Sequence, residues 1–135
     1  MDAQLREEVW RRASGRCEYC HFPSDCAELD FQIDHVIARK HGGSTESANL
    51  ALACFYCNSH KGPNIAGVDP VSQEIVTLFH PRRDSWLKHF RWHGPLLEGC
   101  TPSGRATIAV LRINDTEAIA VREALVAEGK PRAEG

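Results

Sequence analysis

The alternation of apolar and polar residues predicts a helix, two strands and a second helix in the first half of the chain. Residues 3–13 place three apolar side chains on one helical face among arginine and glutamate residues, which predicts a short amphipathic helix. Residues 29–37 alternate in their first half, so we expect a strand there. The apolar run at residues 49–54 predicts a second strand that pairs back on the first. Residues 54–61 are typical of a short helix closed by glycine and proline.

The second half of the chain carries weaker signals. Residues 74–79 are strand-like, and residues 84–90 suit one or two helical turns. Thr101 is a good N-cap before a proline, which predicts a helix over residues 102–111. A last helix is expected over residues 116–127, with apolar residues on one face.

Length and composition limit the classes of protein that fit this chain. The 135 residues and 15.0 kDa suit one compact domain and exclude a separate cofactor domain. The 42% hydrophobic and 25% charged content is ordinary for a globular protein and argues against wholesale disorder. The sequence contains no apolar stretch of about 18 residues, and its first residues are charged, so we expect neither a membrane span nor a signal peptide. A cytoplasmic protein is therefore expected.

Charge is distributed unevenly along the chain. The net charge of −2 argues against a protein that coats nucleic acid through bulk charge. Residues 76–112, however, hold six basic and two acidic side chains, and histidine and aromatic residues are interleaved with them. This mixture suits contacts with phosphates, although a solvated charged surface is about equally expected.

The cysteines predict a metal site. They form two Cys-x-x-Cys pairs, Cys17 with Cys20 and Cys54 with Cys57, and two single residues, Cys26 and Cys100. Each pair can occupy two corners of a tetrahedron around zinc, with Zn–S bonds of about 2.3 Å. Disulfides are the weaker interpretation without a signal peptide, and neither a redox pair nor plain buried thiols explains two pairs together. We expect a structural zinc ion on the four paired cysteines, whereas the single cysteines are packed residues and Cys26 is a minor competitor for the metal.

Polar residues that could take part in catalysis or metal binding lie between and just after the cysteine pairs. The motifs are, in order, Cys17-x-x-Cys20, Ile33-Asp34-His35-Val36-Ile37, Gly42-Gly43, Asn49-Leu50 and Cys54-x-x-Cys57-Asn58-x-x-Lys61. This order and spacing, over about residues 17–63, resembles the zinc-stapled HNH endonucleases of the ββα-metal fold, also called the His-Me finger. The third named position of that family is often histidine, and here Asn58 keeps an oxygen donor there.

The resemblance implies an α+β fold and an organisation around the ββα-metal core. Residues 1–63 would hold the N-terminal helix and the core with its two cysteine pairs. Residues 64–135 would form a C-terminal extension that packs on the core, basic over residues 76–112 and helical over residues 101–128, within one compact domain. The part of the extension around residues 78–90 is similar to one that accompanies some bacterial HNH domains. We expect Trp86 and Trp92 in it to pack on the core.

The resemblance also implies a chemistry, metal-dependent hydrolysis of phosphodiester bonds, most readily in DNA. His35 would be the general base that activates water. Asp34 and Asn58 would hold one Mg²⁺ or Mn²⁺ ion that acts on the phosphate and the leaving oxygen. Asn49 would have a structural role, in which its side-chain amide binds loop backbone and orients the base.

Several basic side chains are candidates for contacts with the nucleic acid, although each taken alone is more readily a solvated surface residue. They are Arg39, Lys40, His60, Lys61, Arg82 and Arg83.

Ordinary interpretations remain for each site residue. Asp34 suits a strand end, His35 a satisfied buried histidine, Asn49 a turn and Asn58 a helix cap. A catalytically silent zinc-stapled module that binds nucleic acid is the main alternative function. A redox or metal-transfer protein would leave the Asp-His pair and both asparagines unexplained.

Overall fold

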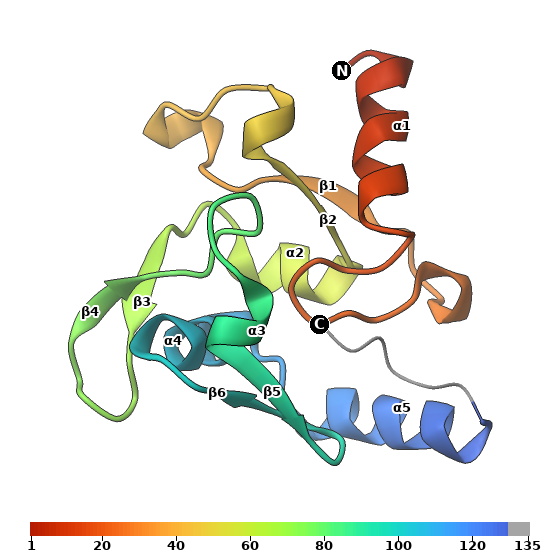
Figure 1. The fold of residues 1–135 in the computed structure, drawn as a ribbon, viewed down its shortest axis with the longest axis vertical. Helices are drawn as coiled ribbons and strands as arrows, with labels where there is room; N and C mark the ends of the chain where they lie inside the picture. The colour runs from red at the N-terminus through yellow and green to blue at the C-terminus, as the bar shows by residue number, and fades with distance from the viewer. Residues whose placement is uncertain (130–135) are drawn as a thin grey trace.

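The computed structural model describes residues 1–129 as an α+β fold (Figure 1). Residues 130–135, the end of the predicted extension, lie outside the described residues. The elements in chain order are α1 (Ala3–Arg12), 3₁₀ helix η1 (Ser24–Cys26), β1 (Gln32–His35), 3₁₀ helices η2 (Arg39–His41) and η3 (Ser47–Asn49), β2 (Leu50–Ala53), α2 (Phe55–Lys61), β3 (Ala66–Val68), β4 (Ile75–Thr77), α3 (Trp86–His89), β5 (Phe90–His93), β6 (Leu96–Gly99), α4 (Pro102–Leu111) and α5 (Thr116–Ala127).

Strands β1 and β2 form an antiparallel hairpin, and α2 packs against both, which completes the expected ββα unit. In the register of the hairpin, Gln32 lies opposite Ala53 and His35 opposite Leu50. All four residues of β2 are buried, because α1 and α2 both contact this strand. Because both faces of β2 are buried, its sequence is a continuous run of apolar residues and does not alternate between apolar and polar residues. Figure 1 shows α2 between this hairpin and α4.

Local capping explains where the main helices begin. The Asp2 side chain accepts a hydrogen bond of 2.7 Å from the Leu5 amide at the start of α1. The Thr101 hydroxyl accepts one from the Gly104 amide at the start of α4, and proline occupies the next position. The helices predicted over residues 3–13, 102–111 and 116–127 are thereby confirmed to within a residue.

The extension also contains a hairpin that the sequence pattern did not predict. Strand β5 begins at Phe90, where we expected a helical segment to end, and pairs with β6 through a tight turn. Gly94 in that turn has φ +59°, a conformation that favours glycine. Trp86 and Trp92 pack against the hydrophobic core, as expected, with their ring centroids 6.2 Å apart.

Helix α4 joins the extension to the ββα unit. It packs against α2 as well as against β3, β4 and β6. Arg105 on α4 donates two hydrogen bonds of 2.8 Å to the buried carboxylate of Asp69, in the turn after β3. Within residues 1–129, no helix combines the length and the apolar character needed to cross a membrane.

Candidate functional site

The four paired cysteines come together as a candidate zinc site. Their sulfur atoms all lie within 4.8 Å of one another, and the four residues are buried. The sulfurs of Cys20 and Cys54 are 3.8 Å apart. Zinc–sulfur bonds of about 2.3 Å at tetrahedral angles place two sulfurs about 3.8 Å apart, so the spacing fits Zn²⁺.

Backbone amides support this sulfur cluster. The Cys20 amide donates to the Cys17 sulfur at 3.5 Å, and the Cys57 amide donates to the Cys54 sulfur at 3.4 Å. Hydrogen bonds from the neighbouring thiols lower the pKa of Cys54, so one thiolate is already favoured in the cluster. Four thiolates on one Zn²⁺ ion would leave no coordination position for water, so zinc bound here would be structural.

The two single cysteines lie apart from this cluster. Cys26 is half-buried, with its sulfur 3.5 Å from a carboxylate oxygen of Asp25. Cys100 is exposed, so the expectation of a packed cysteine there is wrong. Its position directly after the short strand β6 leaves the side chain in solvent, which sequence spacing does not reveal.

His35 is half-buried at the end of β1. Its Nε2 atom lies 2.9 Å from the hydroxyl oxygen of Thr45, in the loop that leads to β2. The Arg39 guanidinium donates a second hydrogen bond, of 3.1 Å, to the same hydroxyl oxygen. Thr45 therefore fixes the orientation of the imidazole ring.

Asn49 holds the loop between the two strands. Its side-chain oxygen accepts a hydrogen bond from the Ile37 amide, and its amide group donates to the carbonyls of Ile37 and Ser44, each at 2.9 Å. Gly43 makes this close packing possible, since a Cβ atom there would lie 1.7 Å from the Ile37 carbonyl oxygen. The contact of this amide with loop backbone agrees with the expectation, while its effect on activity stays a prediction.

Asp34 lies on the opposite face of β1 from His35 and is only 5% exposed. The Tyr19 hydroxyl donates a hydrogen bond of 2.7 Å to its carboxylate, and the Lys61 ammonium lies 3.1 Å from the same oxygen. Burial raises the pKa of Asp34, while the Lys61 and Tyr19 contacts oppose this shift.

Lys61, the last residue of α2, is the principal partner of this carboxylate. The residue is 1% exposed. Its Nζ atom lies 3.3 Å from the second Asp34 oxygen, 3.4 Å from the His35 carbonyl oxygen and 3.0 Å from that of Val36. The expectation that Lys61 contacts nucleic acid is therefore not met in this structure, because the ammonium is buried among these oxygens.

Asn58 is half-buried on α2, one helical turn before Lys61. Residues three positions apart share a helix face, so Asn58 lies on the side of α2 that carries the contact with Asp34. Among the contacts of residues 1–129, its side-chain amide has no hydrogen-bond partner. Its oxygen is therefore free to accept a ligand.

Three of the six basic candidates point into solvent: Arg39, Lys40 and Arg83 are exposed. Two of them belong to η2, which follows the Asp-His pair directly. His60 instead faces α4, where its Nδ1 atom lies 3.1 Å from the Leu111 carbonyl oxygen. That contact joins α2 to the extension, and the expected phosphate contact of His60 stays a prediction.

Arg82 forms an ion pair with Glu18, and its side chain is only 18% exposed. The other Glu18 oxygen accepts a hydrogen bond of 2.8 Å from the Leu52 amide. Burial and the nearby Arg12 guanidinium lower the pKa of Arg82 to about 10, so it remains charged at neutral pH. The guanidinium thus ties the extension to the loop of the first cysteine pair, and the expected phosphate contact of Arg82 stays a prediction.

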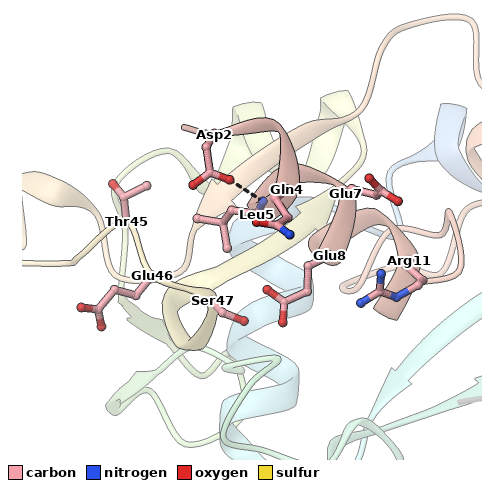
Figure 2. Close-up of a pocket in the computed structure, with 9 residues that line it drawn as sticks. All are labelled: Asp2, Gln4, Leu5, Glu7, Glu8, Arg11, Thr45, Glu46 and Ser47. Carbon is pink, nitrogen blue, oxygen red and sulfur yellow. Dashed lines mark hydrogen bonds between the residues drawn. The ribbon is translucent and has the colours of Figure 1, made fainter.

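An acidic cavity lies beside the loop that holds His35. Figure 2 shows this cavity between α1 and residues 45–47, and its volume is about 610 Å³. Its charged lining residues are four acidic and one basic: Asp2, Glu7, Glu8, Glu46 and Arg11. This side of the loop carries negative potential, whereas η2 carries positive charge.

Two contacts of the site were missed by the sequence analysis. Tyr19 lies between the cysteines of the first pair, and nothing in a Cys-x-x-Cys spacing points to a hydroxyl on Asp34. Thr45 follows two glycines and a serine, a context typical of any polar loop. Only the folded hairpin brings it back to His35.

Comparison with known proteins gives one match. The family model described as HNH endonuclease matches residues 17–64. Comparison with curated proteins and comparison with solved structures each gave no significant match. The matched residues contain β1, β2, α2 and both cysteine pairs. Residues 17–64 of this chain are therefore similar to the HNH endonuclease family, and the four cysteines within them cluster as a candidate zinc site.

Proposed function

We propose that this protein is a metal-dependent endonuclease that hydrolyses phosphodiester bonds of DNA. One observation carries the proposal: the imidazole of His35 is held by Thr45 at the end of β1, within the segment that matches the HNH endonuclease family. A half-exposed histidine held at one ring nitrogen suits a general base, because the other nitrogen stays free to take a proton from water.

The contact with Thr45 supports Nδ1 as the reactive atom of the base. The Thr45 hydroxyl oxygen accepts a hydrogen bond from Arg39, and it can accept a second from Nε2–H of His35. In that tautomer Nδ1 has no proton and carries the lone pair. Nδ1 therefore takes the proton from the attacking water.

The residues around Asp34 suit a divalent cation. The Asp34 carboxylate and the Asn58 amide oxygen are the hard donors that Mg²⁺ and Mn²⁺ prefer. The Lys61 ammonium, which is itself a cation among four oxygens, supports a site that favours positive charge. A divalent ion bound by Asp34 and Asn58 would stabilise the developing charge on the phosphate and the leaving oxygen.

Charge around the site suggests how the nucleic acid lies. The exposed side chains of Arg39 and Lys40 can contact phosphates, and the exposed Arg83 is a further candidate in the extension. The acidic cavity beside α1 would repel phosphates (Figure 2). The nucleic acid therefore approaches from the η2 side, where His35 Nδ1 can reach the attacking water. The zinc ion on the four cysteines is structural in this proposal.

A plasmid assay tests the proposed function. Purified protein is incubated with supercoiled DNA and Mg²⁺ or Mn²⁺, and with a chelator too weak to remove zinc. We expect nicking or linearisation only with the divalent ion, and a loss of at least about 1000-fold in His35→Ala, in line with removal of a general base and its positioning.

The matched control is His93→Ala, which removes an exposed histidine from β5 and should retain activity. Equal cleavage by the wild type and His35→Ala would contradict the role of His35. Equal DNA binding without cleavage by either protein would favour the silent nucleic-acid-binding module.

A further inference from the structure

The Lys61 ammonium forms an ion pair with the Asp34 carboxylate. The proposed function assigns this same carboxylate to a divalent metal ion. Its ammonium lies in an oxygen cage, formed by both oxygens of Asp34 and the carbonyl oxygens of His35 and Val36, at 3.0 to 3.4 Å. Asp34 is 5% exposed and Lys61 1% exposed, so neither charge is compensated by bulk water. The ammonium therefore supplies the positive charge that this buried carboxylate requires.

We infer that the Lys61 ammonium and the catalytic divalent cation compete for Asp34, so that metal binding displaces Lys61 from the oxygen cage. This inference rests on the proposed function, because it takes Asp34 as a metal ligand.

The geometry makes the two cations mutually exclusive. The Lys61 Nζ atom is within 3.3 Å of both Asp34 oxygens, and the Tyr19 hydroxyl occupies a further acceptor position on one of them. A divalent ion bound to the same carboxylate would lie within a few ångströms of the ammonium, in a buried setting where like charges repel strongly. One cation must leave before the other binds.

Lys61 has the freedom to leave. It is the last residue of α2, and Gly62 follows with φ +51°, so the chain already turns out of the helix there. Its flexible four-carbon stem allows the ammonium to move into solvent without moving the helix. An ammonium displaced into solvent could contact an incoming phosphate, which is the contact first expected of Lys61.

This exchange couples the metal to the substrate. When a divalent ion binds, the displaced Lys61 ammonium becomes available to the nucleic acid. Metal and nucleic acid should therefore strengthen each other's binding. Without metal, the buried pair keeps α2 joined to the end of β1. Lys61 is thus a positioning residue in one state and a substrate contact in the other.

Lysine acetylation of the wild-type protein tests the exchange directly. The protein is treated briefly with acetic anhydride, with and without Mn²⁺, and the modified peptides are quantified by mass spectrometry. We expect Lys61 to be unreactive without metal and at least tenfold more reactive at saturating Mn²⁺. Lys40 and Lys88 are exposed and serve as internal controls whose reactivity should not change.

A second measurement uses variants and does not depend on activity. Mn²⁺ affinity is measured by electron paramagnetic resonance for the wild type, Lys61→Met, Asp34→Asn and the matched control Lys88→Met. Removal of the competing ammonium should raise the affinity of Lys61→Met at least tenfold. Asp34→Asn should bind at least tenfold more weakly than the wild type, and Lys88→Met should bind like the wild type.

Three results would overturn the inference. These are a Lys61 that stays unreactive at saturating Mn²⁺, a Lys61→Met variant that binds Mn²⁺ no better than the wild type, and an Asp34→Asn variant with unchanged affinity. The acetylation result stands even if a variant does not fold. Failure of the proposed function is distinguishable, because it appears as absent cleavage while Mn²⁺ still displaces Lys61.

Discussion

Replacement of Asn49 by alanine should weaken the fold and the reaction together. The side chain is 8% exposed and makes three hydrogen bonds of 2.9 Å to loop backbone. Each such bond contributes about 1 kcal/mol, and a buried polar group left without a partner costs about 1 to 3 kcal/mol. We therefore expect Asn49→Ala to lower the free energy of unfolding by about 2 to 4 kcal/mol, which a domain of ordinary stability survives.

The loop held by Asn49 also carries Thr45, the residue that orients His35. A shift of about 1 Å in a reacting group costs about 100-fold in rate, so kcat of folded Asn49→Ala should fall by about 10- to 100-fold. Asn49→Asp is a sharper variant, because it keeps the acceptor for the Ile37 amide but loses both donated bonds.

Urea denaturation and DNA cleavage below the unfolding transition measure the two effects. With an m-value of about 2 kcal/mol/M, the midpoint should move down by about 1 to 2 M. Asn64→Ala, an exposed asparagine just after α2, is the control and should change stability by less than about 0.5 kcal/mol. A fully folded Asn49→Ala protein with wild-type kcat would refute the reasoning, whatever its stability.

Four further predictions test other parts of the structure. Thr45→Val should lower kcat about tenfold with unchanged DNA binding, and Thr45→Ser should restore it; equal rates for both would exclude a role for the Thr45 hydroxyl in orienting His35. Arg83→Ala should weaken DNA binding and lower the salt slope by about one, whereas Arg82→Ala should mainly lower thermal stability; the reverse would show that Arg82 is the DNA contact. The Arg105 guanidinium holds the pKa of Asp69 well below its usual range. The stabilising effect of the Asp69–Arg105 ion pair should therefore be complete at neutral pH and decline as the pH falls below about 4. The difference in unfolding free energy between the wild type and Asp69→Asn should accordingly shrink from pH 6 to pH 3. Removal of zinc with a strong chelator should abolish cooperative unfolding followed by circular dichroism, and added Zn²⁺ should restore it; persistence of the transition would contradict a structural metal.

The sequence was sufficient for the parts of the fold in which local patterns and close spacing determine the outcome. The second strand is a four-residue apolar run, and both of its neighbours are helices that bury it. The cap at Thr101 and the proline after it set the start of α4 directly. The cluster of the two cysteine pairs could be predicted from their spacing, because the hairpin between them brings them together.

Other parts depend on contacts that no local pattern encodes. The helical segment expected through residue 90 gives way to a strand at Phe90, because Phe90 is fully buried against Trp86 and the hairpin β5–β6. Lys61 and Arg82 follow patterns typical of surface cations, and only the folded chain supplies Asp34 and Glu18 as their partners. A basic residue in a sequence predicts charge, but its partner decides whether that charge is available to a ligand.

The first cysteine pair links the structural metal to the proposed catalytic carboxylate. Tyr19 lies inside the turn formed by Cys17 and Cys20, is fully buried, and donates to Asp34 at 2.7 Å. The position of Cys17 and Cys20 therefore sets the position of the Tyr19 hydroxyl, and the hydroxyl in turn limits the orientation of Asp34. The extension reaches the same turn, since the Trp86 indole donates to the Tyr19 carbonyl at 2.9 Å. Because Tyr19 is held from both sides, the candidate zinc site and the extension both act on the geometry of this one carboxylate through Tyr19.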